Sequence, residues 1–398
     1  MSLVEEPAAT DPAPRAAAPA LPSNWQRMRV WATAHAVDDL YQGLVPAAVP
    51  FFVLERGYSY AAASGLALAA TFGSAIPQPL IGHLADRHAL RWLAPAGLIL
   101  AAIGVGLSGL VVPYPAVFAL LLVSGFGIAM FHPPAGRDAR RAAAHSATAM
   151  SYFAAGGSVG FFVAPALATP ALAAWGLQAT ALFIPPAVLM AFVLSRHQRR
   201  QLAQAATHHA HAGRDQPRMF GLLAAVEITR SCISFGINTF VALYWIRHLG
   251  ASAGLGGTAL TLELGGGIAG TLIGGRIGDR LGLLRAVQVG NALLIPAFVA
   301  LLLCQNPYAA LPLVALLGLV TNIPFAVLIK LGQDYLPSRP GTAAGVTLGL
   351  AVSAGGLFQP VLGVIADHHG PQGAFIVLAT LPLVALALSS RLRPPAPH

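Results

Sequence analysis

Ionisable residues interrupt a long apolar stretch near the N-terminus, and their positions point to transport chemistry. His35, Asp38 and Asp39 stand in this stretch, and Asp39 follows Arg29 by ten residues. Ten helical residues rise about 15 Å, which reaches the middle of a hydrocarbon layer about 30 Å thick. A carboxyl at that depth is costly and usually marks a path for ions or substrate, and a desolvated carboxyl can take up and release protons. We therefore predict that Asp39 or Asp38 carries a coupling proton.

The helical spacing in this stretch distinguishes the two aspartates. Adjacent residues of a helix point about 100° apart, so both carboxyls cannot face one cavity. His35, Asp39 and Gln42 share one face at i, i+4 and i+7. This spacing favours Asp39 as the cavity residue and places His35 and Gln42 beside it in a substrate site. The alternative is a helix-packing group neutralised by His35 or Arg230.

A second polar stripe lies in the apolar stretch 219–246. It consists of Glu227, Arg230, Ser231, Ser234 and Asn238, which recur at helical spacing. A guanidinium in the middle of the membrane could hold a phosphonate or carboxylate through two parallel hydrogen bonds. We therefore predict that Arg230, Glu227 and Asn238 contribute to substrate binding. The alternative is a structural Arg230–Glu227 pair one helical turn apart.

Two more buried candidates follow from position alone. Glu263 precedes Gly275 by twelve residues, or about 18 Å of helix, and is a further candidate for the coupling proton. His132 precedes two prolines near the end of its apolar stretch and could line the cavity. The alternative for Glu263 is a hydrogen-bonded packing group that faces the bundle interior, and the alternative for His132 is a hydrogen-bonding group beside a hinge. The sequence His208-His209-x-His211 lacks surrounding carboxylates or thiols, so we expect no metal site and no cofactor.

The composition places these residues in a membrane protein. Hydrophobic residues make up 56% of the chain and charged residues 9%, whereas about 25% of the residues of a soluble domain are charged. The formal net charge of +9 could suggest nucleic acid, but the basic residues cluster in short gaps between apolar runs, where they set topology. We expect the bilayer, a small-molecule substrate and a coupling proton as partners, no nucleic acid, and a monomer.

The polar interruptions leave room for about twelve helical spans of about 20 residues each. The predicted spans are 29–53, 60–82, 92–112, 115–136, 144–168, 174–195, 219–246, 255–276, 286–304, 309–330, 341–365 and 372–390. The fold class is therefore an all-α membrane protein with both termini on one side. That side holds 20 of the 23 Lys and Arg residues, and basic residues are retained in the cytoplasm. We predict a multi-pass protein of the bacterial inner membrane with both termini cytoplasmic.

The longest polar break divides the chain into two halves. We predict a disordered cytoplasmic tail at 1–24, a six-helix bundle at 25–195, a basic cytoplasmic linker at 196–218, a second six-helix bundle at 219–391 and a cytoplasmic tail at 392–398. The run Gly82-His-Leu-Ala-Asp86-Arg87 of the first half recurs 193 residues later as Gly275-Arg-Ile-Gly-Asp279-Arg280. Two parallel repeats with a site at their interface are a recurring plan of secondary transporters.

The repeated run has the composition of a conformational latch between the halves. Its glycine lets two helix ends approach closely, its aspartate can interact with a neighbouring helix N-terminus, and its arginine suits the anionic inner surface. The predicted latch residues are Gly82, Asp86, Arg87, Gly275, Asp279 and Arg280.

The Gly-x-Leu-Ala-Asp-Arg run resembles the cytoplasmic signature of the major facilitator superfamily, and the resemblance covers about residues 29–390. It implies two pseudo-symmetric bundles that rock about a central site. Within the superfamily the chain looks like the fosmidomycin-resistance efflux proteins through three stretches. These are His35-x-x-Asp38-Asp39, Phe131-His132-Pro133-x-x-x-Arg137-x-Ala139, and Arg230-Ser231 followed by Gly236, Thr239-Phe240 and Leu243-Tyr244. Asp38 stands where that family usually carries Asn.

These observations favour a transporter over an enzyme. The sequence contains no nucleotide-binding glycine loop, no HExxH pair and no Gly-x-Ser-x-Gly elbow. Gly156-Gly157-x-x-Gly160 with Pro165 loosely resembles the glycine-proline motif of antiporter-type facilitators, which favours efflux. We predict proton-coupled efflux, by alternating access, of a small amphiphilic or anionic compound such as a fosmidomycin-like antibiotic. Proton-coupled uptake of a small organic anion and a facilitator-fold sensor are the alternatives.

Overall fold

The computed structural model describes residues 24–88, 90–204 and 214–395. The regular structure within these residues is helical, and no strand occurs among them. Residues 1–23 of the predicted N-terminal tail, 205–213 of the predicted linker and 396–398 of the predicted C-terminal tail lie outside the described residues.

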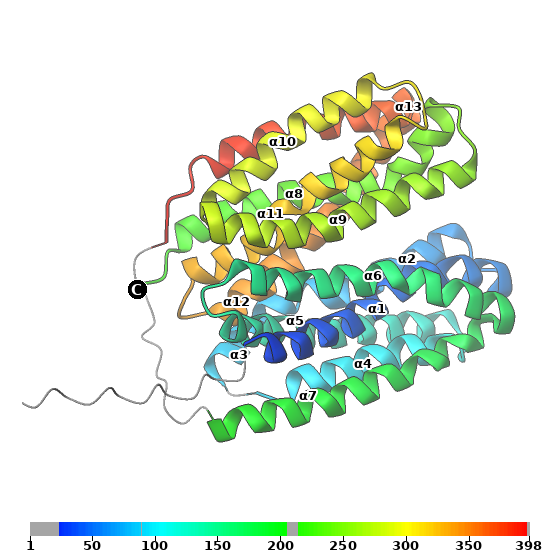
Figure 1. Ribbon diagram of the computed structural model, residues 1–398. Helices are drawn as coiled ribbons and strands as arrows, with labels where there is room; N and C mark the ends of the chain where they lie inside the picture. Colours follow the sequence, from blue (N-terminus) through cyan, green and yellow to red (C-terminus); the bar gives the residue numbers. More distant parts are fainter. Residues whose placement is uncertain (1–23, 89, 205–213, 396–398) are drawn as a thin grey trace, which may run out of the picture.

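The first half of the chain packs as one group of helices, the N-terminal bundle (Figure 1). It contains α1 (Asn24–Arg56), α2 (Tyr60–Ala75), α3 (Gln78–Arg87), α4 (Leu93–Ser108), α5 (Tyr114–Ala143), α6 (Ala147–Trp175), the 3₁₀ helix η1 (Gly176–Phe183) and α7 (Ile184–Gln204).

The second half packs as a separate group, the C-terminal bundle (Figure 1). It contains α8 (Pro217–Leu243), the π turn η2 (Tyr244–His248), α9 (Ala253–Leu281), α10 (Leu283–Leu303), α11 (Ala310–Tyr335), α12 (Pro340–Ala344), the π turn η3 (Gly345–Leu350) and α13 (Ala351–Ser389).

Helices occur at every predicted span, but the described stretches long and apolar enough to cross a membrane do not include 60–82, 92–112 or 255–276. Seven helical stretches in the described residues are long and apolar enough to cross a membrane. Two of these, Ala147–Arg199 and Pro340–Ser389, are 53 and 50 residues long, and each covers two predicted spans. Gly370 divides the second stretch, because its φ of 70° is open mainly to glycine. The predicted all-α membrane fold is confirmed, and the count of twelve stays a prediction.

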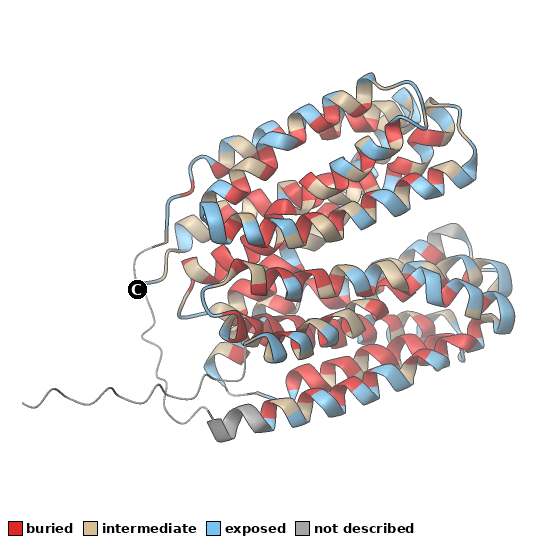
Figure 2. Cartoon of the chain, in the orientation of Figure 1, coloured by how far each residue is buried: buried red, intermediate tan, exposed pale blue. Residues whose placement is uncertain are grey.

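The distribution of burial suits a protein that is surrounded by lipid (Figure 2). Large apolar side chains such as Leu54, Leu189 and Leu303 are exposed on the outside. Carboxyls such as Asp38 and Glu227 are instead buried between helices. Large exposed apolar surfaces mark contact with a membrane or a partner, and polar groups inside a membrane protein face the bundle interior.

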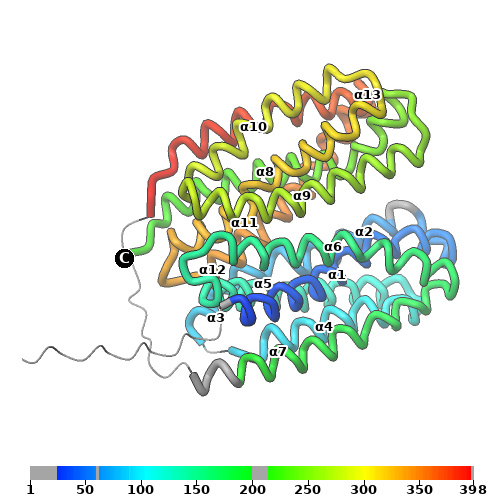
Figure 3. The backbone as a smooth tube through the Cα atoms, in the orientation of Figure 1, coloured from blue at the N-terminus to red at the C-terminus, as the bar shows by residue number. Residues whose placement is uncertain are grey.

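The backbone path brings the two bundles together at one end (Figure 3). There α3 packs against α12, and α6 packs against α9. This is the end at which α1 begins and α13 ends, and we call it the terminal side (Figure 1). Each of these two helix pairs joins one bundle to the other.

Candidate functional site

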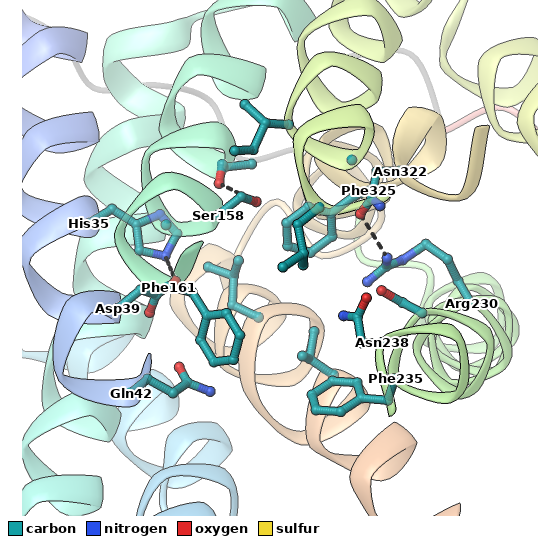
Figure 4. Close-up of a pocket in the computed structure, with 18 of the residues that line it drawn as sticks. His35, Asp39, Gln42, Ser158, Phe161, Arg230, Phe235, Asn238, Asn322 and Phe325 are labelled. Carbon is teal, nitrogen blue, oxygen red and sulfur yellow. Dashed lines mark hydrogen bonds and ion pairs between the residues drawn. The ribbon is translucent and has the colours of Figure 1, made fainter. Parts of the chain in front are cut away.

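A pocket lies between the two bundles, and both contribute side chains to it (Figure 4). Helices α1, α5 and α6 form its N-terminal wall, whereas α8, α9, α11 and α13 form most of its C-terminal wall. Seven of the predicted site residues line it: His35, Asp39, Gln42, His132, Arg230, Asn238 and Glu263. The side chains that the sequence placed in two separate stripes therefore face a common space.

On the N-terminal wall, two imidazoles and one carboxylate converge. The Nε2 atom of His132 lies 3.2 Å from Nε2 of His35 and 3.1 Å from Oδ1 of Asp39. The Nε2 atom of His35 lies 3.4 Å from Oδ2 of Asp39. The Nδ1 atom of His35 is 2.8 Å from the carbonyl oxygen of Phe153, and the His35 ring is stacked on the Phe153 ring. The cluster thus combines α1 with α5, and the backbone of α6 orients one of its rings.

Asp38 does not line the pocket, in agreement with the 100° helical spacing. Its side chain is fully buried, and neither carboxylate oxygen has a hydrogen-bond partner within the described residues. Its Oδ2 atom lies 3.7 Å from Nε2 of His132. Asp39 lines the pocket with 15% of its side chain exposed. Which of the two aspartates carries a proton stays a prediction.

The space for the cluster depends on a glycine of α6. A Cβ atom at Gly157 would overlap Oδ2 of Asp39 and lie 2.6 Å from Nε2 of His35. The sequence indicated this glycine only as part of a small-residue pattern. The structure places it directly against the two ionisable side chains.

On the C-terminal wall, Arg230 is held by Glu227 through two hydrogen bonds. Its Nε donates to Oε2 at 2.9 Å and its Nη2 donates to Oε1 at 2.6 Å. Its Nη1 lies 3.4 Å from Oδ1 of Asn322, and the guanidinium lies 4.5 Å from the centre of the Phe325 ring. Arg230 therefore forms the ion pair with Glu227 that was the structural alternative. It also lines the pocket, as a role in substrate binding requires.

Glu263 is a buried carboxyl on the same wall. It lines the pocket from α9, and no ion pair reaches it among the described residues. When the amide nitrogen of Asn238 faces it, that amide donates to both carboxylate oxygens, at 3.3 Å to Oε1. The neighbour of this carboxyl is thus a neutral amide and not a cation.

Sequence reasoning missed several residues of the pocket, notably Ser158, Phe161, Phe235, Asn322 and Phe325 (Figure 4). Asn322 left a signal, because it is an amide inside the apolar run 309–330. The phenylalanines left none, because an apolar ring facing a pocket cannot be told from one facing lipid in a single sequence.

At the terminal side, the repeated aspartates join the bundles. Asp86 of α3 accepts hydrogen bonds from the backbone nitrogens of Gly341 and Thr342 at 2.7 and 2.8 Å, and from Oγ1 of Thr342 at 2.8 Å. A Cβ atom at Gly82 would overlap the backbone at Gly341. The C-terminal half of α3 thus lies directly on the start of α12.

The second copy of the repeated run lies in the C-terminal bundle and contacts the start of α6 in the N-terminal bundle. Asp279 of α9 accepts hydrogen bonds from Oγ of Ser146 and the nitrogen of Thr148, each at 2.9 Å, and from the nitrogen of Ala147. A Cβ atom at Gly275 would lie 2.7 Å from the carbonyl oxygen of Ala147.

The environment of Asp279 favours its charged form. Asp279 lies beyond the predicted span 255–276, at the terminal side. Burial acts to raise its pKa, but the hydrogen bonds from Thr148, Ala147 and Ser146 outweigh burial and hold the pKa below its ordinary value. Arg87 and Arg280, the last members of the two runs, are exposed. The function of the six residues as a latch stays a prediction.

A third inter-bundle contact links α5 to α11. Arg140 forms an ion pair of 2.8 Å with Asp334, which also pairs with Lys330 at 2.9 Å. The Gln333 side chain donates to the carbonyl oxygen of Gly136 at 2.9 Å. Polar contacts thus join three helix pairs across the bundles at the terminal side.

The arrangement of two bundles around one pocket agrees with the comparison of the sequence with protein families. The chain matches the model of the Major Facilitator Superfamily over residues 32–360 and again over residues 223–398. The chain belongs to the Major Facilitator Superfamily. It is therefore a membrane transporter and not an enzyme, as predicted.

The curated relatives of this superfamily member support the resemblance drawn from its motifs. The fosmidomycin resistance protein of Escherichia coli (strain K12) is 28% identical over 370 residues, which cover 89% of each chain. The uncharacterized MFS-type transporter YfnC of Bacillus subtilis (strain 168) is 25% identical over 369 residues, with 88% and 89% covered. The predicted resemblance to the fosmidomycin-resistance proteins is confirmed.

Solved structures of superfamily members share the fold. The transporter FucP in its outward conformation superposes with a TM-score of 0.75 at 13% identity, covering 93% of this chain and 99% of FucP. The human organic anion transporter MFSD10 (TETRAN) gives a TM-score of 0.69 at 17% identity, covering 92% and 100%. At these identities the likeness concerns the fold alone.

Proposed function

We propose that this transporter exports a small amphiphilic or anionic compound in exchange for protons, by alternating access. The observation that carries the proposal is the pocket between the bundles, where charged and amide side chains of both halves face one space. The relation to the fosmidomycin resistance protein supports efflux of a compound of fosmidomycin's kind. Polar groups buried at the interface of two repeats are typical of a transporter's substrate site.

The orientation in the membrane indicates which side of the pocket is closed. In this proposal the protein lies in a bacterial inner membrane with its terminal side in the cytoplasm, because basic residues concentrate on that side. The contacts of Asp86, Asp279 and Arg140 then close the cytoplasmic end. The pocket accordingly belongs to an outward-facing state, and substrate enters from the cytoplasm once these contacts separate.

Substrate recognition divides between the polar and aromatic parts of the C-terminal wall. The pair with Glu227 occupies Nε and Nη2 of Arg230, and Nη1 remains at the pocket beside Asn322. An anionic group of the substrate would be held there by charge-assisted hydrogen bonds. The rings of Phe235 and Phe325 offer apolar surface for the rest of an amphiphilic molecule.

We place the coupling proton on Glu263. This carboxyl is buried, lines the pocket and has the Asn238 amide as its neighbour. Asp39 already lies within reach of two imidazoles, and Asp38 does not line the pocket. Among the described residues that line the C-terminal wall, Glu263 is the only carboxylate, and it has no cationic partner. A bound proton would neutralise its charge. The choice of Asp39 or Asp38, made from the sequence, stays the alternative.

Drug susceptibility tests the proposed direction and substrate. Expression of the chain in a strain that lacks its own drug exporters should raise the fosmidomycin concentration that stops growth and lower the amount inside the cells. The Glu263→Gln variant, present in the membrane at the same level, should lose this protection. Increased uptake and increased sensitivity on expression would instead support import of an organic anion.

A further inference from the structure

We propose that His35, Asp39 and His132 form a binding site for a divalent first-row transition-metal ion in the wall of the pocket. This inference goes beyond the proposed function and does not depend on it. It rests on the separation of the three donor atoms, the orientation of His35, the charge of the surrounding wall and access from the pocket.

The three donor atoms are spaced as ligands of one ion. The two Nε2 atoms lie 3.2 Å apart, Nε2 of His132 lies 3.1 Å from Oδ1 of Asp39, and Nε2 of His35 lies 3.4 Å from Oδ2 of Asp39. One donor atom from each of the three residues lies within 4.8 Å of the other two. Zinc binds imidazole nitrogen and carboxylate oxygen at about 2.0–2.2 Å in a tetrahedron, which puts neighbouring ligand atoms about 3.3 Å apart. The two imidazole nitrogens are thus at ligand spacing, and a side-chain adjustment of Asp39 would bring one of its oxygens to the same ion.

The hydrogen bond of His35 prepares its ring for metal binding. Its Nδ1 lies 2.8 Å from the carbonyl oxygen of Phe153, an acceptor, so Nδ1 carries the proton. The lone pair of the neutral ring is then on Nε2, which faces Asp39 and His132. Metal-binding histidines almost always donate their other N–H to a carbonyl or carboxylate in this way.

The charge of the N-terminal wall also favours a cation. Next to Asp39, but outside the pocket lining, lies the buried Asp38, whose oxygens have no hydrogen-bond partner among the described residues and whose Oδ2 lies 3.7 Å from Nε2 of His132. None of the residues that this wall contributes to the pocket lining is Lys or Arg. A buried carboxylate without a counter-charge is costly. A divalent ion bound by Asp39 would supply a counter-charge to this acidic pair.

The site is accessible and leaves coordination positions open. His35, Asp39 and His132 all line the pocket, and Gly157 places no side chain over them. Two imidazoles and one carboxylate with open positions are a ligand set used for zinc and for ferrous iron. Water or an oxygen atom of a substrate in the pocket could complete the coordination of the ion.

The competing account is a hydrogen-bond network without metal. In that account the Nε2 proton of His132 is shared between Asp39 and His35. Both accounts use the same atoms, but only the first requires the protein to take up one equivalent of metal. Direct metal binding therefore separates them.

The test uses the full-length protein in detergent, purified through a tag without histidine. All samples carry His208→Ala, His209→Ala and His211→Ala, because the linker histidines could bind metal themselves. We expect one equivalent of Zn²⁺ in calorimetric titrations, and one equivalent of Co²⁺ with a visible spectrum of nitrogen and oxygen coordination. His35→Ala and His132→Ala should each raise the Kd by about 100-fold or more.

The matched control is His248→Ala, since His248 lies in η2 of the other bundle and outside the cluster. Its Kd should equal that of the parent. If the parent binds no stoichiometric Zn²⁺, or if His35→Ala and His132→Ala bind as the parent does, the metal site is refuted. Should either variant fail to fold, the Co²⁺ spectrum of the parent decides, because an unchanged spectrum of hydrated Co²⁺ would also refute the site. Metal binding is measured without transport, so the proposed export can fail while the metal site stands.

Discussion

Asp86 and Asp279 occupy corresponding positions 193 residues apart and make reciprocal contacts between the bundles. Asp86 binds the first turn of α12 from the N-terminal bundle, and Asp279 binds the first turn of α6 from the C-terminal bundle. The unpaired N–H groups and the dipole of a helix N-terminus favour a carboxylate there. The internal repeat of the sequence thus produces two equivalent sets of inter-bundle hydrogen bonds at one end of the molecule.

The first prediction concerns the role of this contact in turnover. Asp86→Asn keeps the side-chain size but loses the charge, which should weaken the closed terminal side by about 1 kcal/mol, or roughly fivefold. Because Asp86 lies outside the pocket, the transport rate should fall more than substrate affinity. Rate and Kd are measured on the same preparation. Asp367→Asn, an exposed aspartate far along α13, is the control, and a large loss of affinity at normal turnover would contradict the latch.

The second prediction concerns pH. Hydrogen bonds hold the pKa of Asp279 below its ordinary value despite partial burial. A carboxylate with a lowered pKa gives its stabilisation above its ordinary titration range and loses it only as pH falls through the lowered pKa. The ratio of transport rates between Asp279→Asn and the parent should therefore be the same at pH 6 and pH 8. A ratio that approaches one at pH 6 would show that the carboxylate is already protonated there.

The third prediction separates the two roles of Arg230. Replacing either member of a buried ion pair costs about 3–5 kcal/mol, because a charge is left without its partner. Glu227→Gln removes the counter-charge and should have a cost of this size, whereas Arg230→Lys keeps the charge, loses the two parallel hydrogen bonds to Glu227 and should cost less. Both variants should melt at a lower temperature than the parent. The double variant Arg230→Gln, Glu227→Gln should regain part of this loss, because no unpaired charge remains.

Substrate binding in the same variants assigns Arg230 to the site or to the scaffold. If Nη1 of Arg230 holds an anionic substrate, every Arg230 variant should bind it at least tenfold more weakly, including the double variant with restored stability. Recovery of binding in the double variant would show that Arg230 serves only as the partner of Glu227.

The fourth prediction concerns Gly157. A methyl group at this position would collide with Asp39 and His35, so Gly157→Ala should reduce transport at least tenfold in a protein that still reaches the membrane. Gly265→Ala in α9 is the matched control, because a Cβ atom there has nothing within 4 Å. Normal transport in Gly157→Ala would mean that the cluster of His35, Asp39 and His132 has no part in the transport cycle.

Much of the fold could be predicted because it depends on local patterns. Apolar length predicted the helical spans, and the repeat predicted paired contacts of Asp86 and Asp279 with helix ends. The 100° spacing of helical residues indicated that Asp39, and not Asp38, faces the pocket. Each of these inferences uses only distances along a single helix or between two copies of one motif.

The remaining features depend on which helices become neighbours. Asn322 reaches Arg230 from 92 residues away, and Arg140 reaches Asp334 across the bundle interface. No periodicity in one sequence shows such pairings. The sequence also gave no reason to expect that His35 and His132 bring their Nε2 atoms within 3.2 Å, because they lie on different helices.

The most direct test of proton-driven export uses inverted membrane vesicles, whose outer surface is the cytoplasmic face of the membrane. With an acidic lumen, vesicles that contain the protein should accumulate labelled fosmidomycin above its external concentration. A protonophore should abolish the accumulation, and Glu263→Gln should reduce it at least tenfold. Accumulation only when the outside is acidic would show symport, and no accumulation under either gradient would contradict the proposed export.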